Sequence, residues 1–156
     1  MQSDSVKMET AHALLDRLVG EWELTGEMGD VPLHQDVSAQ WVLGHLFVEM
    51  RFRSTLPAPD GTLYEAIYHI GYNAPADSFV LHLLDTSGVA TTCTVGVGRR
   101  EGSGVPFVFN YASGPFTNRF IYDADTDGWI MQLSSVENGR VVQFALKRMV
   151  RKKQAG

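Results

Sequence analysis

The apolar residues near the start of the chain follow a helical period. They recur at i, i+3, i+4 and i+7 spacing, which places them on one stripe of a helix. The residues of this stripe are Ala11, Leu14, Leu15 and Leu18. The pattern predicts an amphipathic helix over residues 8–19, with Thr10 as its N-cap and Gly20 as its end. We expect its apolar stripe to pack against a sheet.

From Glu21 onward the period changes to two, which is typical of strands with one buried face. Short turns rich in Gly, Pro, Asn and Asp separate the segments. The expected strands cover about residues 21–27, 35–43, 46–53, 63–72, 78–85, 89–98, 105–112, 117–122, 128–135 and 140–150. Strands joined by short turns pair antiparallel, and closing the sheet removes both unpaired edges. The sequence therefore predicts an all-β fold, an up-and-down antiparallel barrel of about ten strands with a short N-terminal helix.

The length of 156 residues fits one domain with a sizeable core. We expect a helix over residues 8–19, a barrel over residues 20–150 and a basic tail over residues 151–156. Eight-stranded barrels can already enclose a small ligand, so a barrel of about ten strands has room for a cavity.

The net charge of −5 argues against a nucleic-acid partner, which would require a basic face. Five of the 13 Lys and Arg residues nevertheless lie in the last ten positions, namely Lys147, Arg148, Arg151, Lys152 and Lys153. We interpret this cluster as a solvated strand end and tail, with contact to an anionic surface as the alternative.

Cys93 is the only cysteine, so no intrachain disulfide can form, and a cytoplasmic location is favoured. Its neighbours predict a buried structural thiol on a strand. Residues 1–10 are polar and do not resemble a signal peptide, and no apolar run approaches the ~20 residues of a membrane span. We therefore expect neither a leader nor a membrane span.

No catalytic signature is present, because no Ser lies in a Gly-x-Ser-x-Gly elbow and Cys93 has no Cys-His motif around it. The run from Asp123 to Gly128 opens like a calcium loop, but its twelfth position is Ser134 instead of Glu. A polar hairpin turn is the preferred interpretation. We expect no catalytic residue, metal or cofactor.

Two His–Glu pairs, His45 with Glu49 and Glu65 with His69, have i, i+4 spacing on predicted strands. This spacing separates the members by about 13 Å, too far for one metal ion. Across neighbouring strands, His69 or Glu65 could instead meet Glu49 or Arg51. The patch is interpreted as exterior ion pairs or as a ligand-orienting cluster inside the barrel.

Two aromatic stripes provide candidate walls for a ligand cavity. One stripe holds Tyr64, Tyr68 and Tyr72, and the other holds Phe107, Phe109 and Tyr111. Periodicity does not say which faces point inward, and such stripes also fill cores. The candidate ligand-binding residues are Tyr64, Tyr68, His69, Phe107, Phe109, Tyr111 and Arg51.

The junction Gly20-Glu21-Trp22 resembles the start of lipocalin-like (calycin) barrels, which open with Gly-x-Trp. In those barrels an Arg of the last strand stacks on the indole, which implies that Arg148 does so here. Three landmarks, at residues 18–22, 41–47 and 71–73, are similar to an uncharacterised bacterial family of lipocalin-like barrels, domain of unknown function 1579. His45 departs from the Gly usual in that family. The resemblance implies a barrel with a pocket and no established activity.

These observations support three hypotheses about function. The leading one is a cytoplasmic, non-enzymatic barrel that binds a small, largely apolar molecule. The second is a barrel enzyme or a nitrobindin-like haem protein, although Leu24 replaces a glycine of that pattern and the last histidine, His82, precedes the later strands. The third is an interaction module that homodimerises through its outer face.

Overall fold

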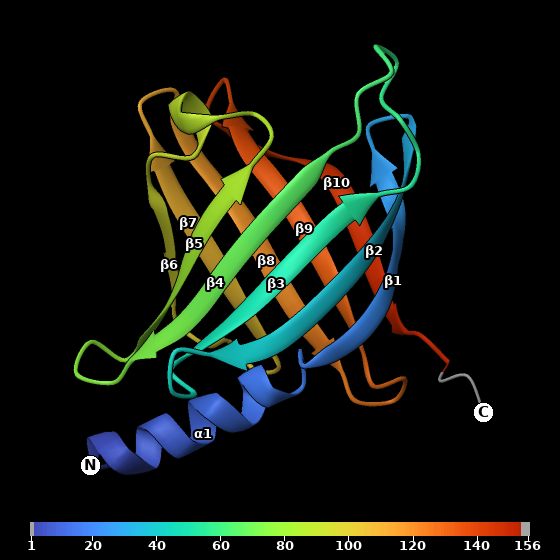
Figure 1. Cartoon of the computed structure of the whole chain (residues 1–156). Helices are drawn as coiled ribbons and strands as arrows, with labels where there is room; N and C mark the ends of the chain where they lie inside the picture. Colours follow the sequence, from blue (N-terminus) through green and yellow to red (C-terminus); the bar gives the residue numbers. More distant parts are fainter. Residues whose placement is uncertain (1, 154–156) are drawn as a thin grey trace.

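The computed structural model of the protein describes residues 2–153 and is a closed barrel of ten antiparallel strands with one α-helix at its end (Figure 1). The elements are α1 (Asp4–Asp16), β1 (Gly20–Met28), β2 (Val31–Val42), β3 (Phe47–Ser54), β4 (Glu65–Asn73), β5 (Ser78–Asp85), the 3-10 helix η1 (Val89–Thr91), β6 (Val95–Gly98), β7 (Gly104–Tyr111), β8 (Gly114–Asp123), β9 (Gly128–Glu137) and β10 (Arg140–Arg151). Each strand pairs with its neighbours in the chain, and β1 closes the ring on β10. The predicted up-and-down barrel is confirmed.

The closure between β1 and β10 depends on a close approach of the two backbones. β10 carries an irregularity between Gln143 and Ala145, which lets the strand bend. Gly26 lies opposite Lys147 in this pairing. A Cβ atom on Gly26 would lie 2.2 Å from the carbonyl oxygen of Leu146, so only glycine permits this approach.

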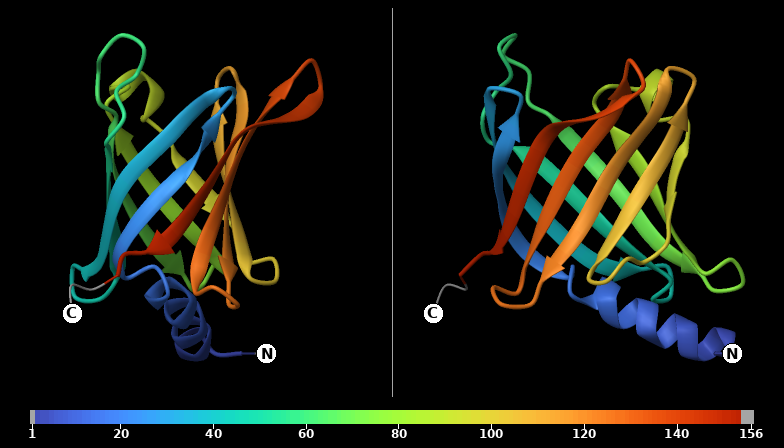
Figure 2. Two further views of the ribbon diagram at one scale, coloured as in Figure 1. Left: turned by 90° about the vertical axis from the view of Figure 1, so that its right-hand side faces the viewer. Right: turned by 180° about the vertical axis from the view of Figure 1, so that it is seen from behind.

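Helix α1 lies across one end of the barrel (Figure 2). It begins after Ser3, whose Oγ accepts a hydrogen bond from the backbone N–H of Val6, and it ends at Asp16. The prediction of a helix over residues 8–19 capped by Thr10 is therefore wrong at both ends. Thr10 lies inside the helix, and the chain leaves it early so that Leu18 can enter the barrel end, where it is buried. Neither helical segment of residues 2–153 is long and apolar enough to cross a membrane.

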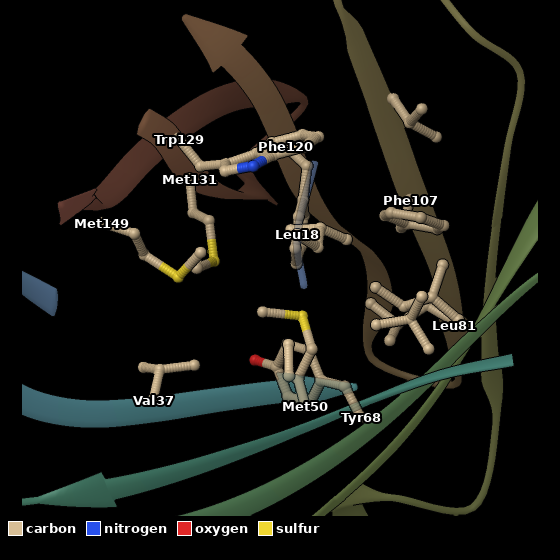
Figure 3. Close-up of a cluster of buried hydrophobic side chains, with 14 of the residues drawn as sticks. Leu18, Val37, Met50, Tyr68, Leu81, Phe107, Phe120, Trp129, Met131 and Met149 are labelled. Carbon is tan, nitrogen blue, oxygen red and sulfur yellow. The ribbon is translucent and has the colours of Figure 1, made fainter. Parts of the chain in front are cut away.

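Large side chains fill the half of the lumen beside α1. Figure 3 shows side chains of opposite walls, among them Met149 and Leu81, converging on Leu18. We call this region the helix-side half and define it by the buried side chains of Leu18, Trp22, Leu24, Val37, Met50, Ile70, Leu81, Phe107, Phe120, Trp129, Met131 and Met149. Alternation along each strand directs these side chains inward and polar residues outward.

Trp22 joins the helix end to the barrel wall. Its side chain is fully buried, and its Nε1 donates a hydrogen bond of 2.7 Å to the carbonyl oxygen of Leu18. The guanidinium carbon of Arg151 lies 4.2 Å from the centre of its ring. Gly20 has a φ of +137°, and a Cβ atom there would lie 2.7 Å from Nη1 of Arg151. The Gly-x-Trp pattern therefore provides both the turn and the space for the arginine.

The arginine that stacks on Trp22 is Arg151, so the expectation for Arg148 is wrong. Arg151 lies opposite Trp22 in the β1–β10 register, whereas Arg148 is exposed on the outer face. The reason is parity, because residues an odd number of positions apart on a strand point to opposite faces. Arg151 also donates to the carbonyl oxygens of Val19 and Arg17, at 2.8 and 3.0 Å.

The basic residues near the end of the chain do not form one patch. Arg151 is the last residue of β10 and not part of a tail, Lys147 is buried inside the barrel, and Lys152 forms an ion pair of 2.8 Å with Asp36. The rest of the predicted basic tail, residues 154–156, lies outside the described residues. These basic residues therefore lie in different environments, inside the barrel, at the strand end and on the surface.

The aspartate-rich segment between β8 and β9 is a hairpin turn, as predicted. Asp123 accepts hydrogen bonds from the backbone of Asp125 and the hydroxyl of Thr126. Asp127 has a φ of 51° and accepts from both Tyr122 and Arg151. The hydrogen bond from Arg151, with that from Tyr122, holds the pKa of Asp127 below its ordinary value. The carboxylate of Asp123 therefore stabilises the turn, and that of Asp127 binds Arg151 beside the helix end.

The predicted strand over residues 89–98 is shorter in the structure, because only Val95–Gly98 pairs with its neighbours. Upstream, the chain forms η1 and a loop at the far end of the barrel. Cys93 lies in this loop and is exposed, so the prediction of a buried thiol on a strand is wrong. The Val and Thr residues here favour a strand by propensity, but Gly88 has a φ of 90°, which turns the chain out of the sheet.

Candidate functional site

The half of the lumen away from α1 contains a cavity of about 1030 Å³. We call this region the open half. It lies between the far ends of the strands and the β3–β4 and β5–β6 connections. Several residues at its rim are exposed, among them Met28, Val31 and Leu56, so the cavity opens to solvent at this end. Ligand cavities in proteins are typically about 300–1,000 Å³, so this volume suffices for a small molecule.

Most of the cavity wall is apolar. The larger apolar side chains on it are Met28, Val31, Pro32, Leu33, Leu56, Pro57, Pro59, Leu83, Phe116, Leu133 and Phe144. Tyr64, Tyr68 and Tyr111 add aromatic surface with a hydroxyl group each. A wall of this kind favours a largely apolar ligand, because burying apolar surface is the main source of affinity.

Tyr64 and Asp85 form a hydrogen-bonded pair on this wall. The hydroxyl of Tyr64 donates to Oδ2 of Asp85 at 2.8 Å, and the backbone N–H of Ser87 donates to Oδ1 at 2.9 Å. Burial raises the pKa values of Tyr64 and Tyr68 well above the ordinary value, and the charge of Asp85 adds to this effect. Both phenols therefore keep their protons at neutral pH.

Lys147 is the charged residue that the sequence reasoning missed. It lies on the inner face of β10, is only 4% exposed and lines the cavity. Burial lowers its pKa from 10.5 to about 8, although the charge of Asp85 acts in the opposite direction. The signal was available, because Ala145, Lys147 and Met149 share one strand face. The cluster of basic residues at the end of the chain instead favoured a solvent-exposed position for Lys147.

Two buried amides lie near the boundary between the two halves. Gln35 lines the cavity, and its Oε1 has no hydrogen-bond partner within residues 2–153. Asn118 is fully buried on β8 near the hydroxyl of Tyr68, and neither its Oδ1 nor its Nδ2 forms a hydrogen bond of good geometry in that range. Buried polar atoms usually have partners, so the unpaired Oε1 of Gln35 is a polar group that a molecule in the cavity can contact, whereas Asn118 does not line the cavity.

The structure separates the predicted ligand-binding residues into three places. Tyr64, Tyr68 and Tyr111 line the cavity, and their role in binding stays a prediction. Phe107 and Phe109 point inward but do not line the cavity; both are buried in the core, and the ring of Phe109 packs against Phe116 of the cavity wall at 5.5 Å between centroids.

His69 and Arg51 lie on the outer wall of the barrel, so the expectation that they orient a ligand inside the cavity is wrong. The buried Met50 and Tyr68 are their inward-facing neighbours, and alternation turns His69 and Arg51 outward. Both contact Glu49, at 2.9 Å from His69 Nε2 and 3.0 Å from Arg51 Nε. The predicted meeting across strands is confirmed. The hydrogen bond from His69, with that from Arg51, holds the pKa of Glu49 below its ordinary value.

The five histidines of the chain lie away from the cavity wall. They are His12, His34, His45, His69 and His82. His12 and His45 lie beside Trp41 near α1, at the opposite end of the barrel. The haem alternative requires a histidine late in the chain, and the last one, His82, lies on β5 and is absent from the cavity wall, so the positions of the histidines give this alternative no support.

Comparisons with known proteins place the chain in a family without giving it an activity. A family model described as "Protein of unknown function (DUF1579)" matches residues 7–112. Functionally curated proteins give no match. Among solved structures, a de novo designed fluorescence-activating β-barrel has 14% identity and a TM-score of 0.49 over 88% of this chain and 95% of that chain. A redesigned β-barrel has 12% identity and a TM-score of 0.44 over 92% of this chain and 96% of that chain.

Proposed function

The chain belongs to the DUF1579 family of proteins of unknown function, and we propose that it binds a small, largely apolar molecule in the open half of its barrel. The observation that carries this proposal is the cavity of about 1030 Å³ with its mostly apolar wall. The tyrosine hydroxyls and Lys147 provide the few polar groups that fix the orientation of a ligand in such sites.

The distribution of buried residues supports a binding role. The side chains of the helix-side half meet across the lumen and form the core, whereas those of the open half, among them Leu33, Leu83 and Phe116, line a space between them. Side chains could fill a barrel of this size, as they do beside α1. A cavity that is present in one half only therefore supports a role in ligand binding.

The proposal includes a finer class and location. The Gly20-x-Trp22 junction with Arg151 on the indole supports a lipocalin-like barrel, as in the resembling bacterial family. The single cysteine, Cys93, which cannot form an intrachain disulfide, supports a cytoplasmic location. In this proposal the protein works as a carrier or sensor of its ligand, without catalysis.

An uncharged solvatochromic dye such as Nile red tests the proposal. We expect the native protein to bind about one dye molecule, with blue-shifted emission. Leu133→Trp places a large ring on the cavity wall and should weaken binding at least tenfold. Gln132→Trp is the matched control, because Gln132 is the preceding residue of β9 and alternates to the outer face. It should leave binding unchanged.

Circular dichroism must show that both variants keep the native fold. A native protein that binds no dye would overturn the proposal, as would a folded Leu133→Trp variant with unchanged affinity. A symmetric dimer that buries a large area of the outer barrel face, formed by a protein that binds no dye, would instead favour the interaction module.

A further inference from the structure

Lys147 is a buried cation with no partner among residues 2–153. No hydrogen bond or ion pair within residues 2–153 involves its ammonium group, and no carboxylate lies within 4.0 Å of it. Burying an unpaired charge is costly, and proteins normally pair such groups. Because the side chain lines the cavity, a bound molecule can supply the missing partner.

Asp85 carries the negative charge of the cavity but is already engaged elsewhere. Each of its carboxylate oxygens accepts a hydrogen bond, one from Tyr64 and one from the backbone of Ser87. Its charge favours the protonated form of Lys147 without direct contact. Of the two charged groups on this wall, the one without a partner among residues 2–153 is therefore the cation, and an anion can supply that partner.

The position of Lys147 defines how a ligand would lie. On β10 it is closer to Arg151, at the helix end, than to Arg140, at the open end. The next inward-facing residue, Met149, belongs to the filled helix-side half. Lys147 thus lies at the inner end of the cavity, whereas the rim carries apolar residues such as Val31 and Leu56. A charged head would lie deep, with an apolar body extending to the rim.

We infer that the cavity binds an amphipathic acid, an apolar molecule with one carboxylate head, and that Lys147 binds this head at the inner end. The inference rests on the proposed function and names its ligand class. A single ammonium group matches a single negative charge. A dianionic head is disfavoured because Asp85 would repel its second charge.

Two probes of equal shape test the inference, a dansyl-labelled medium-chain fatty acid and the primary amide of the same acid. Hydrogen bonds to charged groups are worth about 1.5–3 kcal/mol, so the native protein should bind the acid at least tenfold more tightly than the amide. Lys147→Met should abolish this preference by weakening only the acid. Lys153→Met removes an exposed lysine as the matched control and should change neither affinity.

The pH profile of the native protein gives a second readout that needs no folded variant at position 147. The acid should lose affinity as the pH rises above about 8, because Lys147 then loses its proton. The amide should not. The other titratable groups on the wall are Tyr64, Tyr68, Asp85, Cys93 and Tyr111. Performing the titration also in Cys93→Ser and Asp85→Asn proteins removes two of them, and the loss of affinity should remain.

The outcomes separate the two proposals. If neither probe nor the uncharged dye binds, the proposed function fails. If the dye and the amide bind but the acid has no advantage, or if folded Lys147→Met protein binds the acid as tightly as native protein, the cavity stands and the assignment of an acidic ligand is overturned.

Discussion

The two halves of the barrel lumen are built on the same strands but have different contents. On β9, Met131 packs in the filled helix-side half, and Leu133, the next inward-facing residue, lines the cavity of the open half. On β10, Met149 and Lys147 show the same change. The packed side chains of the helix-side half therefore stabilise the fold, and this allows the open half to contain a cavity.

Trp22→Ala should have the largest effect, because Trp22 anchors the filled half. It is fully buried, bonded to Leu18 and covered by Arg151. Truncating a buried Trp typically costs about 3–5 kcal/mol of unfolding free energy. Urea denaturation measures the change. A midpoint equal to that of native protein would contradict the division between the halves.

Paired truncations on β9 sharpen the comparison. Met131→Ala opens a hole in a packed region and should cost about 2–5 kcal/mol. Leu133→Ala enlarges an existing cavity and should cost less than about 2 kcal/mol, because fewer packing contacts are lost. The two unfolding free energies are compared under identical conditions. Equal losses would show that the open half is as tightly packed as the other.

The stability of the ligand-free protein should rise with pH in the range where Lys147 loses its proton. The pKa is about 8 in the folded state and 10.5 in the unfolded state, so the unfolded state binds more protons between these values. Stability should therefore increase by about 2 kcal/mol between pH 8 and pH 10. Above about pH 10 the raised pKa values of Tyr64 and Tyr68 act in the opposite direction, because the folded state then holds more protons.

Lys147→Met should remove this rise and stabilise the protein at neutral pH, where the native protein holds an unpaired buried charge. Lys153→Met provides the control and should keep the rise. Denaturation curves at several pH values test both statements. A pH dependence that persists in Lys147→Met would assign the effect to another group.

The smallest effect is expected on the outer wall. His69→Ala breaks a partly exposed contact with Glu49, and such pairs are typically worth about 0.2–1 kcal/mol. Dye affinity should not change, because the side chain of His69 points away from the cavity. A double-mutant cycle with Glu49→Ala measures the coupling, and altered dye binding would contradict the outward placement.

The number and order of the strands could be predicted because alternation and turn residues are local signals. The helix limits were missed because the position of Leu18 is decided by its burial against the barrel end and by its bond to Trp22. The extent of the sixth strand was missed for a related reason. Strand propensity at Val89–Thr91 does not reveal that Gly88 turns the chain away from the sheet.

The candidate site was predictable only in part. Tyr64, Tyr68 and Tyr111 lie on the cavity wall, whereas Phe107 and Phe109 are also inward-facing but belong to the core. Periodicity assigns a residue to a face of its strand, and it does not give the height of that residue in the barrel.

The sequence by itself determined that this chain alternates along ten strands and turns at fixed points, because these properties depend on neighbouring residues. Only the tertiary structure decided which strand face points inward, that Arg151 covers Trp22, and that Lys147 lies beside a cavity. These facts depend on the register between distant strands and on the volumes of side chains that meet across the lumen. Neither quantity is encoded in a local pattern.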